Sequence, residues 1–128
     1  MSSLHRNVNP NHADDDFVVT MQAFSPQSKE DYKLSLDSEA VWSAKESFNY
    51  RTRILGRNSL GVWTLDIEEF LKLELQVVAD PVLPPDPPNP SHSLVDFAHK
   101  DKAAKRDAAR RLAAAANERA ISRLIIKP

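Results

Sequence analysis

The chain has 128 residues, a net charge of −1, no cysteine and an apolar content of 41%. This length allows one domain with a hydrophobic core and is too short for two sizeable ones. The lack of cysteine excludes disulfides, thiolate zinc sites and cysteine nucleophiles. Apolar runs span only a few residues, so no membrane-spanning helix is predicted, and residues 1–16 show no apolar secretory signal.

The charge is divided unevenly along the chain. Residues 1–99 carry 8 Lys/Arg against 15 Asp/Glu, a net charge of −7, whereas residues 100–128 carry 9 against 3, a net charge of +6. An acidic body with a basic tail suits either a polyanionic partner or an acidic surface elsewhere in the same assembly.

The first elements are an arm and two strands. Residues 1–16 are polar and end in three aspartates, which predicts a flexible N-terminal arm. From residue 17 the apolar residues alternate with a period of two, in 17–24 and again in 32–37, where Tyr32, Leu34 and Leu36 share a face. This alternation is typical of strands that are buried on one side.

The same alternation continues through residues 48–55 and 62–67. Phe48, Tyr50 and Ile54 share one face of the first stretch, and the two glycines, Gly56 and Gly61, mark the ends of the polar segment between the stretches. Glycine tolerates the positive φ angles of a tight reversal, so this segment predicts a hairpin turn.

Two further stretches admit more than one secondary structure. Residues 38–47 fit a short helix or part of a strand, and residues 66–73 fit an Asp-capped helix. Strong alternation through Leu71, Leu73, Leu75 and Val77 favours a strand after residue 70. The sheet body is therefore predicted to span residues 17–80.

Six of the nine prolines lie between residues 81 and 90. Proline cannot donate to a sheet ladder and disfavours helix in the residue before it. Residues 81–92 are therefore predicted to form an extended linker, up to about 30 Å long at roughly 3 Å per residue.

A long helix is predicted over residues 93–126. Ser93 and Asp96 resemble a capping box, no glycine or proline interrupts the stretch before residue 127, and bends are expected near Lys100 or Asn117. The apolar stripe is mostly alanine in the middle, so we expect the helix to pack on a second copy of the chain rather than on its own sheet. The predicted oligomer interface comprises Leu94, Phe97, Ala108, Leu112, Ala115, Ala116, Ile121, Leu124 and Ile125.

Residue patterns that would support catalysis or metal binding are scarce. The sequence has no glycine-rich phosphate loop and no Gly-x-Ser-x-Gly or His-Glu-x-x-His motif. His92 and His99 with Asp96, and the aspartates at 14–16, are read as solvated groups rather than metal ligands. We therefore predict a non-enzymatic protein with no cofactor and no metal.

Basic residues are the strongest indication of a ligand. The predicted nucleic-acid contacts are Lys102, Lys105, Arg106, Arg110 and Arg111 on the helix, and Arg51 and Arg53 on a strand face. Such groups can neutralise phosphates. The alternative is a solvated face, because Asp101 and Asp107 lie four residues before Lys105 and Arg111.

The stretches "YKLSLDS", "FNYRTRIL" and "EFLKLELQV", followed by a helix, resemble the later strands of the small single-stranded-RNA phage coat proteins. The resemblance implies sheets joined edge to edge in a dimer, helices that cross onto the partner, an RNA-binding sheet face and assembly into a shell. The opening hairpin of that family is missing here, and the proline-rich segment is unusual. No RNA-contacting residue is carried over.

Together these observations predict an α+β protein with an antiparallel sheet of four to six strands and a long C-terminal helix. The predicted function is a self-assembling, coat-like subunit, a homodimer or larger, in the cytoplasm or a virion. One alternative is a nucleic-acid-binding module that uses the basic helix. Another is an immunity- or antitoxin-like protein whose acidic body binds a basic partner.

Overall fold

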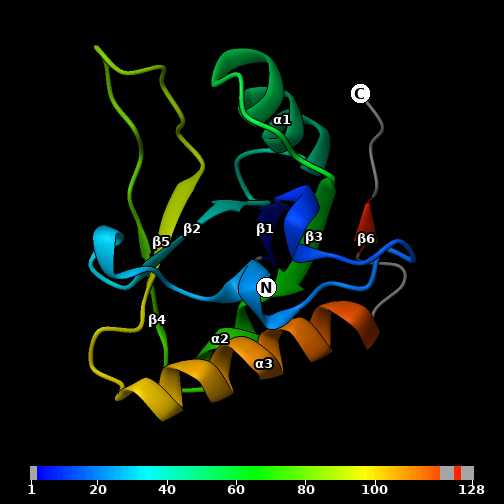
Figure 1. Ribbon diagram of the computed structural model, residues 1–128. Helices are drawn as coiled ribbons and strands as arrows, with labels where there is room; N and C mark the ends of the chain where they lie inside the picture. The colour runs from blue at the N-terminus through cyan, green and yellow to red at the C-terminus, as the bar shows by residue number, and fades with distance from the viewer. Residues whose placement is uncertain (1–2, 119–122, 125–128) are drawn as a thin grey trace.

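The computed structural model describes residues 3–118 and 123–124, and these form one antiparallel sheet with helices on both faces (Figure 1). The strand order is β4-β5-β2-β1-β3-β6, and every pairing is antiparallel. The strands are β1 Ser3–Val8, β2 Lys33–Ser38, β3 Gly61–Asp66, β4 Gln76–Ala79, β5 His92–Asp96 and β6 Arg123–Leu124. The predicted α+β class, with an antiparallel sheet and a C-terminal helix, is confirmed.

The helices are short except for the last. The α-helices are α1 Ala44–Asn49, α2 Ile67–Leu71 and α3 Lys102–Glu118, and a π-helical turn, η4 Tyr50–Ile54, continues α1. Three 3₁₀ turns, η1 Pro10–His12, η2 Met21–Phe24 and η3 Ser28–Glu30, lie between β1 and β2. Figure 1 shows α3 along one side of the sheet and α1 on the other.

The prediction of a flexible N-terminal arm was wrong for residues 3–8. These residues form β1, an inner strand that pairs with β3 along its whole length and with β2 at its start. Leu4 and Val8 are buried in the core. Polar residues between them hide the strand in the sequence, because those side chains are buried by hydrogen bonding rather than by apolar character.

The predicted strand at residues 17–24 was also wrong. This segment ends in η2, which packs against α3 and buries Ala23 and Phe24. Asn117 of α3 holds the segment, because its side-chain amide accepts from the Val19 N–H at 2.9 Å and donates to the Val19 carbonyl at 3.0 Å. Backbone groups here are therefore satisfied by a helix side chain instead of a neighbouring strand.

Residues 48–54 form a helix rather than the predicted strand. Ser43 caps α1 in a reciprocal pair with Glu46, and the chain then continues through η4. Phe48 and Thr52 lie four residues apart and share a face, with the Thr52 hydroxyl donating to the Phe48 carbonyl at 2.9 Å. The apolar spacing in this stretch fits helical and strand periods alike, and the N-terminal cap decides for the helix.

The stretch at 66–73 is also helical at its start, although the apolar alternation after residue 70 had favoured a strand. Residues Ile67–Leu71 form α2, and only Gln76–Ala79 form a strand. The strands expected at 32–37 and 62–67 agree with β2 and β3 to within one residue at either end.

The proline-rich segment joins β4 to β5 rather than linking the sheet to a separate helix. Val82 and Asn89 face each other across this loop and exchange backbone hydrogen bonds at 2.9 and 3.1 Å. The predicted helix start at Ser93 was wrong, since His92–Asp96 form β5 between β4 and β2. The helix begins at Lys102, where the Asp101 carboxylate accepts from the Ala104 N–H.

The helix α3 packs on its own chain, contrary to the expectation that it crosses to a partner. Its small residues allow close approach to η2 and the sheet, so the alanine stripe is covered from within. Of the predicted interface, Phe97, Ala108, Leu112 and Ala116 are at most 2% exposed, and Leu94 and Ala115 are partly buried. Ile121 and Ile125 lie outside the described residues, and of Leu124 only its place in β6 is described.

Candidate functional site

The pairing between β1 and β2 stops after two residues, and Arg6 fills the gap that this leaves. The register is Leu4↔Ser38 and His5↔Asp37, beyond which the strands separate. The Arg6 guanidinium donates from Nε to the Ala23 carbonyl at 2.9 Å and from Nη1 to the Ser35 carbonyl at 2.9 Å. A cation therefore replaces the missing ladder bonds between the strands.

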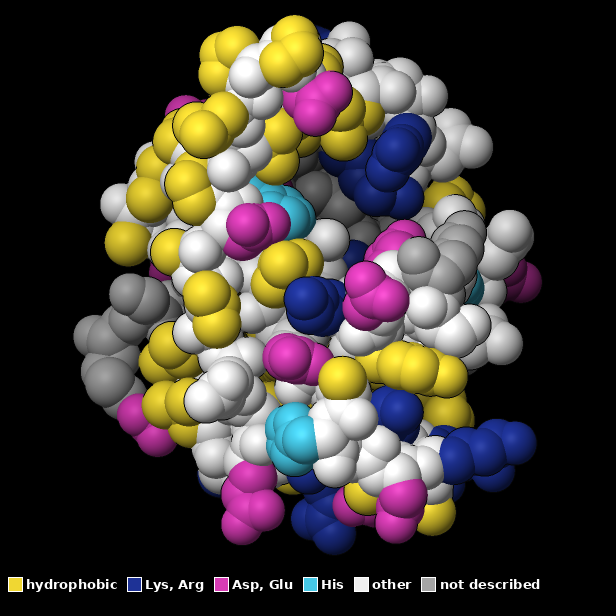
Figure 2. Space-filling model, turned by 90° about the vertical axis from the view of Figure 1, so that its left-hand side faces the viewer, with side chains coloured by type: hydrophobic (Ala, Val, Ile, Leu, Met, Phe, Trp, Pro, Cys, Tyr) yellow, Lys and Arg dark blue, Asp and Glu magenta, His cyan; other side chains and the backbone are white. Residues whose placement is uncertain are grey.

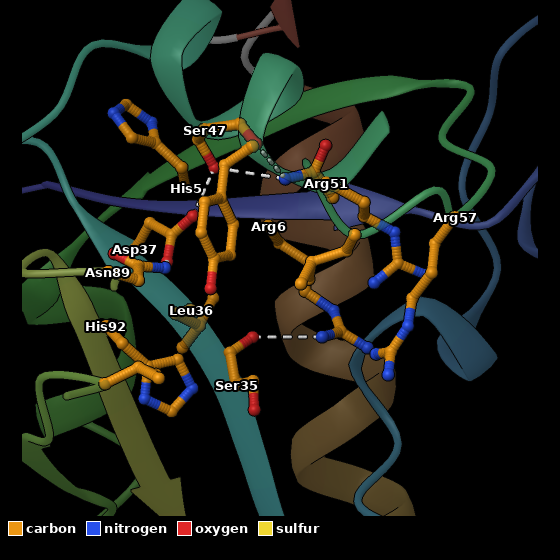
Figure 3. A pocket seen from close by; sticks show the side chains of 14 residues that line it. His5, Arg6, Ser35, Leu36, Asp37, Ser47, Arg51, Arg57, Asn89 and His92 are labelled. Carbon is orange, nitrogen blue, oxygen red and sulfur yellow. Dashed lines mark hydrogen bonds between the residues drawn. The ribbon is translucent and has the colours of Figure 1, made fainter. Parts of the chain in front are cut away.

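Two more arginines reach the same place from η4 and the turn after it. Arg51 donates from Nε to the Asn58 carbonyl at 3.0 Å, and the Arg57 N–H donates to the Arg51 carbonyl at 3.0 Å. Gly56, with φ of +64°, allows the reversal between them. Figure 3 shows the guanidinium ends of Arg6, Arg51 and Arg57 gathered together. We refer to these three residues as the arginine cluster.

No ion pair neutralises the arginine cluster within residues 3–118 and 123–124, because none of the three guanidinium groups has a carboxylate oxygen within 4.0 Å. The nearest buried carboxylate, that of Asp37, is occupied by neutral donors. It accepts from the Ser47 hydroxyl at 2.5 Å and from the Asn89 amide at 2.9 Å. Asp37 and Glu30 act on Arg6 only at longer range.

Burial and mutual repulsion shift the pKa values within the arginine cluster. Burial, and next the charge of Arg51, lower the pKa of Arg6 to about 10, against the opposing influence of Glu30 and Asp37. Burial and then Arg57 lower the pKa of Arg51. Arginine remains protonated at neutral pH despite such shifts. The fold therefore concentrates positive charge where an incoming anion would relieve it.

A network of buried polar side chains supports the floor of the site. Asn7 donates to the Ser47 hydroxyl oxygen at 3.0 Å and accepts from Ser59 at 2.8 Å, and Ser47 in turn donates to Asp37. The ring nitrogens of His5 lie 2.8 Å from the Thr64 hydroxyl and 3.0 Å from the Trp42 carbonyl. With their hydrogen bonds satisfied, these groups hold the cluster in a fixed frame.

Two hollows meet at the arginine cluster and share Arg6, Asn7, Ser35, Arg51 and Arg57. The first, which we name the tyrosine hollow, has a cavity volume of about 170 Å³ and is also lined by Tyr50, Leu55, Val82 and His92. The second, the glutamine hollow, has a volume of about 270 Å³ and is also lined by Asn9, His12, Gln22, Gln27 and Lys33. Figure 2 shows a depression on this side of the molecule, with basic side chains on one rim and hydrophobic side chains on the other.

The proline-rich loop forms one wall of the tyrosine hollow. The Tyr50 hydroxyl donates to the Pro87 carbonyl at 2.5 Å, and the Tyr50 ring lies 5.2 Å from the Trp42 ring. The ring of His92 is held at Nδ1, which lies 2.7 Å from the Asp80 carbonyl. The prolines thus stiffen a wall of the site instead of spacing two bodies apart.

The basic residues predicted from the sequence are dispersed in the structure. Arg51 belongs to the arginine cluster, whereas Arg53 is exposed and lines neither hollow. On α3, Lys105 lies 3.6 Å above the Tyr32 ring and Arg111 bonds to Asp107 at 2.9 Å. Lys102, Arg106 and Arg110 are exposed on the same helix, away from both hollows.

Sequence reasoning missed Arg6 and Arg57. Leu4 and Val8 share one face of a six-residue segment, and this spacing is the sequence signal that could have placed Arg6 on a strand instead of in the predicted arm. Arg57 lies in the segment predicted as a hairpin turn, where nothing in the sequence pointed to a shared site.

Two of the groups weighed as metal ligands, His99 and Asp14, have other partners here. His99 lies 3.0 Å from the Glu74 carbonyl, and Asp14 accepts from the N–H groups of Asp16 and Val18. In the described part of the chain, no three His, Asp or Glu side chains form a group that could hold a metal ion. The described helices include none that is long and apolar enough to span a membrane.

Searches against models of protein families, curated proteins and solved structures returned no match to this chain. The resemblance to phage coat proteins therefore stays a prediction, and functional inference rests on the geometry of the site.

Proposed function

We propose that this protein binds a phosphate-bearing ligand at the arginine cluster. The observation that supports this is the convergence of three guanidinium groups, without a carboxylate partner among the described residues, at the junction of two hollows. Guanidinium groups present paired N–H donors that match phosphate oxygens, and such charge-assisted hydrogen bonds are about twice as strong as neutral ones.

We propose binding rather than catalysis as the role of this site. The side chain best placed to act as a nucleophile, Ser47, is fully buried and already donates to Asp37. Both ring nitrogens of His5 have partners, and the ring points away from the arginines in Figure 3. A nucleophile needs an adjacent general base with access to substrate, and neither group offers that access.

The test is a calorimetric titration of the protein with inorganic phosphate at low ionic strength. The chain offers a matched pair of exposed arginines: Arg57→Gln removes a guanidinium that lines both hollows, and Arg53→Gln removes one that lines neither. We expect saturable binding that Arg57→Gln weakens by about ten-fold or more, because a charged hydrogen bond contributes about 1.5–3 kcal/mol. Arg53→Gln should leave the affinity within about two-fold.

Absence of saturable phosphate binding would overturn the proposal. Equal losses for the two variants would also overturn it, because they would indicate attraction by overall charge rather than a site.

Self-association is a second candidate function, and the observation that favours it is the edge strand β4. In the described sheet β4 pairs only with β5, and Val78 on β4 is 53% exposed. A free edge of this kind can pair with another chain. The coat-like role predicted from the sequence requires such an edge contact, and the immunity-like alternative stays a prediction.

Light scattering of the purified protein at tens of micromolar measures this directly. Self-association through β4 predicts a dimer or larger species that Val78→Lys converts to monomer. A monomer in the unmodified protein would remove this candidate and leave the phosphate site unaffected.

A further inference from the structure

The two hollows on either side of the arginine cluster differ in chemistry. The tyrosine hollow is lined by three ring side chains, His5, Tyr50 and His92, and by the apolar side chains of Leu55 and Val82. The glutamine hollow has hydrogen-bonding side chains, among them Asn9, Gln22 and Gln27. A ligand that fills the site therefore needs a flat, partly apolar group on one side of its phosphate and a polar group on the other.

The position of the cluster between the hollows favours a phosphate that carries a group on each side. A phosphomonoester has one substituent and would occupy only one hollow, whereas a phosphodiester has two. The tyrosine hollow, at about 170 Å³, is smaller than the roughly 300–1,000 Å³ pockets of drug-sized ligands. It therefore has room for one ring system and not for an entire ligand.

The Tyr50 ring is fixed before any ligand arrives. Its hydroxyl is bonded to the Pro87 carbonyl at 2.5 Å, and Trp42 contacts it with an angle of 54° between the ring planes. A ring held in this way loses little conformational freedom when a base stacks on it. Stacking platforms beside a basic groove are the usual means of binding single-stranded nucleic acid.

We propose that the ligand is a single-stranded nucleic acid. One phosphodiester lies on Arg6, Arg51 and Arg57, one base stacks on Tyr50 in the tyrosine hollow, and the adjoining sugar bonds to the amides of the glutamine hollow. This proposal rests on the proposed phosphate-binding function and adds the class of ligand. It places nucleic acid in the gap between β1 and β2 instead of on the basic helix α3.

The experiment compares five probes in the same calorimetric assay: inorganic phosphate, ribose 5-phosphate, AMP, O-phosphotyrosine and the dinucleotide ApA. AMP carries roughly two negative charges, whereas the phosphodiester of ApA carries one, so charge alone predicts that AMP binds more tightly. We expect the opposite order, with ApA binding more tightly than AMP, because a phosphodiester carries a group for each hollow. ApA should also bind at least about five-fold more tightly than ribose 5-phosphate, which has no base to stack.

Variants of the ring test the placement of the base. Tyr50→Ala should abolish the advantage of ApA over ribose 5-phosphate and leave phosphate binding unchanged, while Tyr50→Phe keeps the ring and should keep the advantage. The matched control is Tyr32→Ala, which removes a tyrosine that lines neither hollow. If Tyr50→Ala does not fold, Val82→Trp offers a second test. Its larger side chain fills the tyrosine hollow from the loop, so it should weaken the binding of ApA and leave the binding of phosphate unchanged.

Each contrary result has a separate meaning. Phosphate binding without preference for ApA over AMP would overturn the single-strand proposal and leave the phosphate site standing. AMP or O-phosphotyrosine binding more tightly than ApA would overturn it in favour of a free nucleotide or a phosphopeptide. If none of the probes binds, phosphate included, the proposed function itself fails.

Discussion

The two faces of the sheet bury their side chains by different means. On the face covered by α3 and η2, the buried residues are apolar, such as Phe24, Leu34 and Leu112, and close packing stabilises them. The face covered by α1 also buries Phe48, but its buried polar side chains, His5, Asp37 and Ser47, are held by hydrogen bonds. The packing of the first face needs no explanation beyond stability. The arginine cluster beside the second face gathers like charges, which costs folding free energy, and this cost points to a ligand.

The largest effect is expected on the apolar face. Leu112 is fully buried between α3 and the core, so Leu112→Ala leaves a cavity and should lower the free energy of unfolding by about 2–5 kcal/mol. Urea unfolding followed by circular dichroism measures the change. Arg110→Ala on the exposed side of α3 is the control and should change stability by no more than about 0.5 kcal/mol. Equal effects would show that α3 is not packed as described.

A substitution in the buried polar network on the α1 side should lower the free energy of unfolding by a smaller amount. Asp37→Asn places an amide donor against the Ser47 hydroxyl or the Asn89 amide, and this mismatch should cost about 1–3 kcal/mol of unfolding free energy. The same change removes a negative charge near Arg6 and should tighten phosphate binding. Glu39→Gln, at an exposed carboxylate, is the control. A variant that is both less stable and a weaker binder would contradict this assignment.

Phosphate itself should stabilise the folded protein through the arginine cluster. At ten times its dissociation constant, a ligand that binds only the native state adds about 1.4 kcal/mol, and a ten-fold weaker site reduces this to about 0.4 kcal/mol. We therefore expect the phosphate-dependent rise in unfolding free energy to be largely lost in Arg57→Gln. An identical rise in wild type and variant would indicate a general salt effect.

The smallest effect is a pH dependence from His12. Burial, and next the charges of Arg6 and Arg51, lower the pKa of His12 from 6.5, and Glu30, Lys33 and Arg57 line the same hollow. The unfolded chain then binds the proton more readily, so stability is lost as the pH falls from about 6.5 through the folded pKa. His12→Gln should remove this part of the dependence.

The same histidine also reports on the ligand. An anion on the cluster offsets the positive charge that His12 experiences, so phosphate should raise the His12 pKa in an NMR titration. No shift at saturating phosphate would place the anion elsewhere.

The fold class could be predicted because it depends on local periods. Alternation through residues 32–37 and 62–67 identified β2 and β3, and the alanine-rich stretch without glycine or proline identified the region of α3. At residues 48–54 the apolar spacing fits both periods, and a cap at Ser43 settled the structure as helix. Local sequence patterns fail to predict the secondary structure where the apolar spacing fits both a helix and a strand. They also fail where a strand buries polar residues, as in β1.

The candidate site could be predicted only in part. Arg51 was named from the sequence, but as a contact on an open sheet face, and Arg6 and Arg57 were not named at all. Arg6 and Arg51 lie 45 positions apart along the chain. Their meeting depends on the early end of the β1–β2 ladder, which has no local signature, and on the turn at Gly56, which the glycine signals without showing what the turn brings together.

By itself the sequence determined an α+β domain with an antiparallel sheet and a C-terminal helix, because hydrophobic period and proline placement act over a few residues. Only the tertiary structure decided that α3 covers its own sheet, that the proline-rich loop walls a hollow, and that three arginines share one place. Those outcomes depend on contacts between distant segments, where small side chains permit close packing and where strands part to admit a charged group.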